Sequence, residues 1–158
     1  MVYVSGTAYE GAWVDNKACG QGTCRYADGG RYTGDWKEDH RWGWGQHVSA
    51  EGDSYEGQWF DDVPEGRGRL TYADGSYFEG EFGNGERVEG KLTTADGGFE
   101  YTGGWKDGLR HGVGTCASSG MYKYVGTWAK DQRHGSGSCV YVGGERYDGP
   151  FKVWGPSE

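Results

Sequence analysis

A five-residue pattern of aromatic, any residue, glycine, any residue and aromatic recurs along the whole sequence, its first position returning every 23 residues. The seven copies begin at Tyr9, Tyr32, Tyr55, Phe78, Tyr101, Tyr124 and Tyr147. A constant period of this length indicates a repeat architecture, in which each unit buries its apolar face only by stacking on its neighbours. The chain is therefore expected to fold as an array of similar small units.

In each copy, aromatic, glycine and aromatic occupy positions i, i+2 and i+4, which lie on one face of a β-strand. In the third copy, Glu56 and Gln58 would then point to the opposite face. We assign a structural role, as the repeat cores, to Tyr9, Gly11, Trp13, Tyr32, Gly34, Trp36, Tyr55, Gly57, Trp59, Phe78, Gly80, Phe82, Tyr101, Gly103, Trp105, Tyr124, Gly126, Trp128, Tyr147, Gly149 and Phe151.

A Gly-x-Gly pair follows the core in five repeats: Gly20/Gly22, Gly43/Gly45, Gly66/Gly68, Gly112/Gly114 and Gly135/Gly137. The fourth repeat departs from this, with Val88 before Gly90. A second strand is predicted after each pair, ending at turn signals such as Asp28-Gly29, so each repeat forms one β-hairpin. The core glycine would leave room for the next repeat's aromatic ring to lie flat. The predicted fold is all-β: an elongated single-layer antiparallel β-solenoid of stacked 23-residue hairpins.

Composition supports this fold and excludes a helical one. The 158 residues include 33 glycines and no isoleucine, and glycine lowers helix stability by up to ~1 kcal/mol per site. Twelve tyrosines and eight tryptophans supply the apolar area that aliphatic residues would otherwise bury.

The repeat register divides the chain into a partial repeat 1–8, full repeats 9–31, 32–54, 55–77, 78–100, 101–123 and 124–146, and a terminal partial repeat 147–158. Tyr3 and Gly6 stand 23 residues before Tyr26 and Gly29. We therefore expect the chain to be a fragment of a longer array.

The net charge is −8, which disfavours binding to nucleic acid because a surface that neutralises phosphates needs clustered lysine and arginine. Four cysteines at uneven spacings do not form a disulfide framework, so they are predicted to be thiols in a reducing compartment. A cytoplasmic location is expected.

Tyr-x-Gly-x-Trp followed by Gly-x-Gly at a 23-residue period resembles the MORN repeat (membrane occupation and recognition nexus), and the resemblance covers the whole chain. It is most similar to repeat-only members, which include cytoskeletal scaffolds of parasitic protists. The resemblance implies a scaffold that associates with the cytoskeleton, while the family name implies membrane association.

The chemistry-bearing motifs do not indicate an enzyme or a cofactor. The glycine-rich stretches lack a phosphate-binding lysine motif, and no nucleophile elbow occurs. Cys116 and Cys139 occupy equivalent positions in successive repeats, as do His111 and His134. Equivalent residues lie about 9.5 Å apart across two strand spacings, too far for a disulfide or one zinc within the chain. A zinc shared between two chains stays open.

Two function classes remain. The first is a protein-interaction scaffold, with Trp42 and Trp44 as a candidate partner contact and a homodimer formed through the C-terminal repeats by Phe151 and Trp154. The second is a peripheral module for phosphoinositide headgroups, which would use Lys123, Lys130, Arg133, Arg146 and Lys152. The acidic charge and the absence of a basic cluster favour the scaffold.

Overall fold

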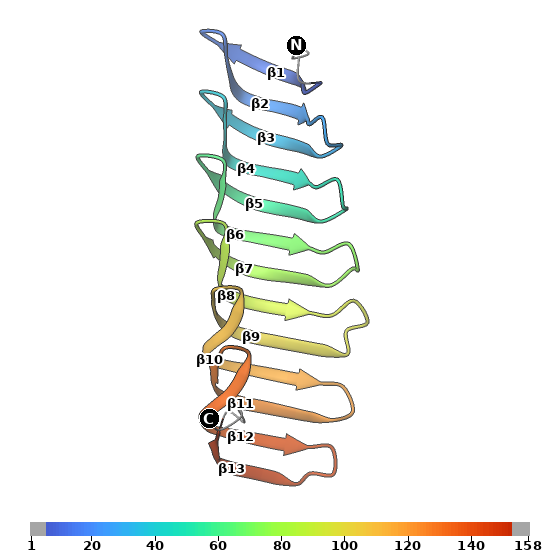
Figure 1. The fold of residues 1–158 in the computed structure, drawn as a ribbon, viewed down its shortest axis with the longest axis vertical. Coiled ribbons are helices and arrows are strands. Elements are labelled where there is room, and N and C mark those ends of the chain that lie inside the picture. Colours follow the sequence, from blue (N-terminus) through green and yellow to red (C-terminus); the bar gives the residue numbers. More distant parts are fainter. Residues whose placement is uncertain (1–5, 153–158) are drawn as a thin grey trace, which may run out of the picture. The chain divides into compact units, whose positions relative to one another are not determined.

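The computed structural model describes residues 6–152, which form thirteen β-strands and no helix (Figure 1). The strands belong to two compact units divided between Gly85 and Glu86. The first unit contains β1 (Ala8–Val14), β2 (Lys17–Arg25), β3 (Arg31–Lys37), β4 (His40–Val48), β5 (Ser54–Phe60), β6 (Val63–Thr71) and β7 (Tyr77–Gly83). The second contains β8 (Glu86–Thr93), β9 (Phe99–Lys106), β10 (Leu109–Ser118), β11 (Tyr122–Ala129), β12 (Gln132–Tyr141) and β13 (Arg146–Phe151).

Within each unit every strand pairs antiparallel with the next strand in the chain (Figure 1). The prediction of an all-β fold built from antiparallel hairpin repeats is confirmed. Successive strands follow one another in the sheet because each connection is a short turn.

The turn after each core differs from the sequence prediction. In the third repeat Asp61 and Asp62 both have positive φ, 48° and 66°, as in the two-residue turns that favour aspartate, asparagine and glycine. The second strand therefore starts at Val63 and contains the Gly-x-Gly pair, rather than following it. The register shifts between Gly57 and Trp59, and Gly66, with φ 85°, provides the backbone conformation at this bulge.

The two faces of the sheet differ as the core pattern predicts. Along β5, Tyr55, Gly57 and Trp59 are buried, whereas Glu56 and Gln58 are exposed. The same alternation in the other full repeats buries the aromatic residues Tyr9, Tyr32, Trp36, Phe78, Phe82, Tyr101, Trp105, Tyr124 and Trp128. This ladder of rings is the core of each unit. Trp13 is only half-buried. The prediction that Tyr147 is a core residue is wrong, because Tyr147 lies in the last described strand and is 42% exposed.

Each tyrosine of the ladder contacts the tryptophan of its own repeat and the tryptophan or phenylalanine at the same position of the next repeat. The Tyr32 ring lies 5.1 Å from the Trp36 ring and 5.3 Å from the Trp59 ring, at interplanar angles of 90° and 84°. This edge-to-face geometry is favoured because the positive ring edge meets a negative ring face. The rings therefore hold neighbouring repeats together.

The prediction that the next repeat's aromatic lies flat over each core glycine is wrong. A Cβ on Gly57 would lie 2.5 Å from the Cα of Gly68 on the paired strand and 2.7 Å from Oη of Tyr55. The glycines thus face each other across the strands, beneath the tyrosine of their own repeat. That tyrosine donates its hydroxyl hydrogen bond to the carbonyl of Gln58, at 2.9 Å.

Candidate functional site

An arginine on the buried face, Arg41, connects its own repeat to the next one. Arg41 is the second residue of β4, just after a turn, and its amide and Nε both donate to Oδ1 of Asp62, at 2.9 and 3.1 Å. Its terminal nitrogen donates to the carbonyl of Asp62 at 2.7 Å. The guanidinium also lies 4.4 Å from the ring centroid of Trp59. We call this arrangement of arginine, aspartate and tryptophan an arginine lock.

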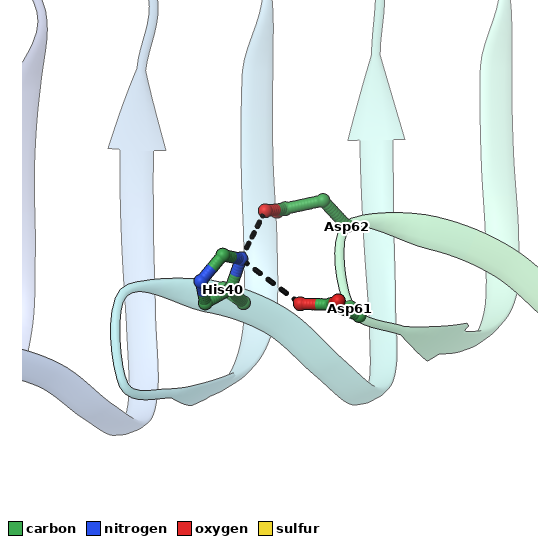
Figure 2. Close-up of side chains that lie close together, drawn as sticks. All are labelled: His40, Asp61 and Asp62. Carbon is green, nitrogen blue, oxygen red and sulfur yellow. Dashed lines mark hydrogen bonds and ion pairs between the residues drawn. The ribbon is translucent and has the colours of Figure 1, made fainter.

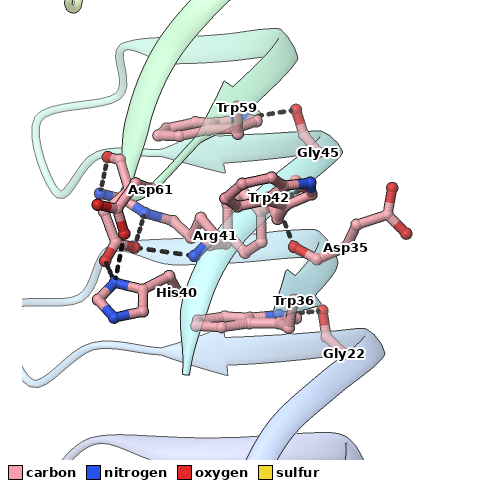
Figure 3. Close-up of polar contacts among 11 residues, drawn as sticks. Gly22, Asp35, Trp36, His40, Arg41, Trp42, Gly45, Trp59 and Asp61 are labelled. Carbon is pink, nitrogen blue, oxygen red and sulfur yellow. Dashed lines mark hydrogen bonds and ion pairs between the residues drawn. The ribbon is translucent and has the colours of Figure 1, made fainter. Parts of the chain in front are cut away.

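Figure 3 shows Arg41 directed toward the turn that carries Asp61, beside two tryptophans in equivalent positions. Trp36 and Trp59 each donate their indole hydrogen to a glycine carbonyl of the preceding repeat, Gly22 and Gly45, at 3.1 Å. These bonds fix the planes of the indoles, so each presents a defined face to a cation.

The second unit contains another arginine lock. The amide and Nε of Arg110 donate to Oδ1 of Asp131 at 2.8 and 2.9 Å, and its guanidinium lies 4.4 Å from the Trp128 ring. The sequence analysis missed these arginines. The signal that could have found them is the same period, because Arg41, Arg87, Arg110 and Arg133 occupy one position of the repeat.

The first repeat keeps the backbone half of the lock without the arginine. Ala18 occupies the arginine position, and its amide donates to Oδ1 of Asp39 at 2.7 Å, while the Asp39 amide donates back to the Ala18 carbonyl at 3.0 Å. Beside it opens a groove of about 730 Å³ whose lining includes Ala18, Tyr26, Trp36, Asp39, Arg41 and His47. We call it the Ala18 groove.

Three titratable groups of the Ala18 groove, Cys24, Tyr26 and His47, have pKa values shifted toward their neutral forms. Burial raises the pKa of Tyr26 to about 12 and raises the pKa of the Cys24 thiol. Burial, with the nearby charge of Arg41, lowers the pKa of the His47 imidazole. A thiol kept protonated is a poor nucleophile, so Cys24 is not activated for nucleophilic attack.

The opposite face carries a second groove, of about 650 Å³, lined by Trp44, Arg67 and Arg69 together with glutamates. Trp44 is 52% exposed. Trp42 instead packs against Phe60, with ring centroids 4.5 Å apart, and its ring holds the Lys37 ammonium at 4.0 Å. Of the candidate partner contact predicted from sequence, the structure leaves Trp44 open and engages Trp42 within the chain.

His40, Asp61 and Asp62 form the one group of at least three potential metal ligands that converge within residues 6–152 (Figure 2). Nδ1 of His40 lies 3.1 Å from Asp61 and 2.7 Å from Asp62. The hydrogen bond to Asp62 raises the pKa of His40. Because Asp62 is also engaged by Arg41, this exposed cluster is explained as an ion pair between turns.

The structure does not bring the predicted cysteine and histidine rows together. Cys116 and Cys139 have no exposed surface, whereas His111 and His134 are exposed. A zinc shared between two chains would need ligands at a surface, and neither thiol reaches one. All four cysteines are free thiols, as predicted.

The C-terminal residues predicted as a dimer contact are only partly described. Phe151 is half-buried, with its ring 4.8 Å from the ring of Tyr124. The other predicted contact, Trp154, lies outside the described residues.

Two of the five basic residues considered for lipid binding are engaged within the chain. Arg146 pairs with Asp148 at 2.7 Å, and Arg133 stacks 4.2 Å from the Tyr122 ring. The remaining three, Lys123, Lys130 and Lys152, are exposed. Within residues 6–152, no helix has the length and apolar character needed to cross a membrane.

Stacked antiparallel hairpins joined by a ladder of aromatic rings define the class of β-repeat proteins. The MORN repeat family matches residues 9–31, 32–54, 55–77, 78–99, 101–121 and 124–146, and the chain therefore belongs to that family. Membership suggests a protein-interaction or membrane-associated scaffold, and MORN repeat proteins are generally non-enzymatic.

No curated protein sequence matches the chain significantly. Among solved structures, the chain is similar to the SAS-4 (dCPAP) TCP domain of Drosophila melanogaster, which was solved in complex with a proline-rich motif of Ana2 (dSTIL). The TM-score is 0.58 at 8% identity, over 95% of this chain and 81% of that chain. At this identity the likeness shows the fold alone.

Proposed function

We propose that the chain is a protein-interaction scaffold, without enzymatic activity, whose repeats hold docking surfaces for partner proteins. The observation that carries the proposal is that each face of the first unit has an open groove, one lined by several aromatic residues and the other containing the exposed Trp44. Aromatic residues are enriched at protein interfaces, because they combine large apolar area with few rotatable bonds. The structurally similar TCP domain was solved with a peptide motif bound, which is consistent with this proposal.

Charge separates the scaffold from a phosphoinositide module. The net charge is −8, and the groove beside Trp44 includes Glu56, Glu79 and Glu81 in its lining. Headgroup binding is electrostatic and needs several clustered basic residues. An acidic surface would instead repel anionic lipid.

Capture of partners from the native cell, run beside vesicle co-sedimentation, tests this proposal. We expect the full chain to retain specific proteins and to show no appreciable sedimentation with phosphoinositide vesicles at physiological salt. Saturable, salt-sensitive vesicle binding with no protein captured would contradict the scaffold and favour the lipid module. Vesicles without anionic lipid are the control.

We propose further that the scaffold is a homodimer joined through its C-terminal repeats. Tyr147 is 42% exposed, and Pro150 of β13 cannot donate to a further strand, as is common at a terminal edge. Light scattering coupled to size exclusion should give about twice 17.3 kDa for the intact chain and a monomer for a chain ending at Lys123. A monomeric intact chain, or a truncated chain that still dimerises, would contradict this interface.

A cytoplasmic, cytoskeleton-associated location completes the proposal. Four free thiols fit a reducing compartment. A fluorescently tagged chain should remain with the detergent-insoluble cytoskeletal fraction after extraction, and full release into the soluble fraction would contradict the association.

A further inference from the structure

The Ala18 groove lies where the first repeat lacks its arginine. In the two complete locks, the arginine follows the turn, its guanidinium stacks on the tryptophan of the next repeat, and its Nε meets the aspartate of the next turn. Ala18, Trp36 and Asp39 occupy these three positions in the first repeat. Only the guanidinium side chain is replaced, by a methyl group.

The backbone around Ala18 matches that of a complete lock. The Ala18 amide donates to Asp39 at 2.7 Å, as the Arg41 amide donates to Asp62 at 2.9 Å. The return bond from the aspartate amide measures 3.0 Å to Ala18 and 3.1 Å to Arg41. The carboxylate of Asp39 and the indole of Trp36 are therefore positioned as the halves of a guanidinium site.

The other repeats that depart from the lock lack the aspartate. In the third repeat Pro64 replaces the arginine, and Gly85 stands where the aspartate would be. In the fourth, Arg87 is kept while Gly108 replaces the aspartate, so the arginine bonds the glycine carbonyl at 2.8 Å. Among the described repeats, the first is the one that keeps the aspartate but not the arginine.

The charge of the groove also favours a cation. Three aspartates line it, Asp28, Asp39 and Asp62, against one arginine, Arg41, and one histidine of lowered pKa, His47. Arg41 already satisfies Asp62. The first 79 residues carry 14 acidic and 7 basic groups, so the surrounding field attracts a positively charged segment.

We infer that the Ala18 groove binds an arginine side chain of an extended, basic segment of a partner protein. The guanidinium stacks on Trp36 and donates to Asp39. The partner's arginine thereby makes the contacts that Arg41 and Arg110 of this chain make in their own locks. Arginine suits this site better than lysine because its planar group can stack and hydrogen-bond at once. The inference rests on the proposed scaffold function and names the chemistry of its partner.

Titration of the full chain with a capped Gly-Gly-Arg-Gly-Gly peptide, followed by the Trp36 indole signal in ¹⁵N NMR spectra, tests this. The wild type should show a saturable shift of the Trp36 signal, with weaker binding of the lysine peptide and none of the uncharged citrulline peptide. Asp39→Asn keeps an oxygen acceptor for the Ala18 amide but removes the charge, and should weaken binding about tenfold.

Ala18→Arg supplies the missing side chain and should abolish peptide binding while raising the melting temperature. Its matched control is Ala50→Arg, which adds the same charge at an exposed turn and should bind as the wild type does. No Trp36 shift in the wild type, or equal shifts in wild type and Ala18→Arg, would overturn the inference. The inference would also be overturned if the wild type did not bind the peptide but formed dimers that Ala18→Arg does not form, because a second copy of the chain would then occupy the groove.

The capture experiment distinguishes this inference from the scaffold function. If the peptide does not bind but wild type and Ala18→Arg capture the same proteins, the arginine site fails and the scaffold stands. If neither captures any protein, the scaffold function itself fails.

Discussion

Replacing Gly114 by alanine should destabilise the second unit, because the glycine has no room for a side chain. A Cβ at this position would lie 2.7 Å from Cε2 of Tyr101, with the tyrosine hydroxyl nearer still. The tyrosine cannot retreat freely, since its ring contacts Trp105 and Trp128 at 5.3 and 5.2 Å. Its hydroxyl also donates to the carbonyl of Gly104 at 3.0 Å.

Overpacking of this kind costs about 1–3 kcal/mol, and loss of the tyrosine hydrogen bond adds about 1 kcal/mol. The reduced freedom of alanine in the unfolded chain returns about 0.4–1 kcal/mol. The net loss is then roughly 1–3.5 kcal/mol, which lowers the melting temperature by about 2–14 °C for a chain of this size. Urea denaturation measures the same change as a lower midpoint.

Gly143→Ala is the matched control, because a Cβ there meets nothing within 4 Å. Its free energy of unfolding should stay within about 0.5 kcal/mol of the wild type. In a Tyr101→Phe background, Gly114→Ala should cost less, since the nearest clashing atom is gone, and the double-mutant cycle gives this coupling. Equal stability of Gly114→Ala and Gly143→Ala would refute the packing of glycine beneath tyrosine.

Three further predictions concern single side chains. Arg110→Ala should lower the free energy of unfolding, measured by urea denaturation, by about 1–2 kcal/mol, because stacking and hydrogen bonds are lost. The control is Arg67→Ala, whose wild-type side chain is 84% exposed and whose free energy of unfolding should stay within about 0.5 kcal/mol of the wild type. Equal losses in the two variants would contradict the arginine lock. Because the pKa of His47 is lowered by burial, the unfolded state binds its proton more readily, and stability falls as pH drops through about 6.5. As the pH is lowered from about 7.5 to about 5.5, the free energy of unfolding of His47→Leu should therefore increase relative to that of the wild type. A difference between the two proteins that does not change with pH would contradict this. A thiol reagent should label Cys19, which is half-buried, before Cys116, whose pKa is raised by burial; Cys19→Ser should remove the fast phase, and its persistence would contradict the burial pattern.

The sequence predicts the core of each repeat because one local rule sets it. Residues at i, i+2 and i+4 share a strand face whatever the partner strand does, so the burial of Tyr55, Gly57 and Trp59 follows from their spacing. The period then carries this rule along the whole chain. All-β architecture and hairpin pairing could be predicted on this basis.

Contacts between strands could not be predicted in the same way, because they depend on register. Gly57 and Gly68 pair across the strands because the second strand begins directly after the two-residue turn at Asp61-Asp62. The sequence analysis did not recognise this turn. Without the register, the sequence does not show which ring fills the room beside Gly57. The ring of Tyr55 fills it.

The groove beside Ala18 could not be predicted from the sequence, because the feature that marks it is a missing arginine. The arginine position is visible as a 23-residue series, yet an alanine within it carries no chemistry of its own. Its meaning comes from Trp36 and Asp39, which the fold brings to it from the next repeat. Only the paired strands show that these two groups lack the arginine that their counterparts contact in the complete locks.

Photo-crosslinking in the native cell tests most directly whether this chain acts by binding protein. A photoreactive amino acid would replace Tyr26, which lines the Ala18 groove, and in a control chain it would replace Val142, which is 69% exposed in the second unit. We expect discrete protein adducts from position 26 that are absent from position 142 and are lost when Ala18→Arg is added. Lipid adducts alone, or no protein adduct from position 26, would contradict the protein-interaction function.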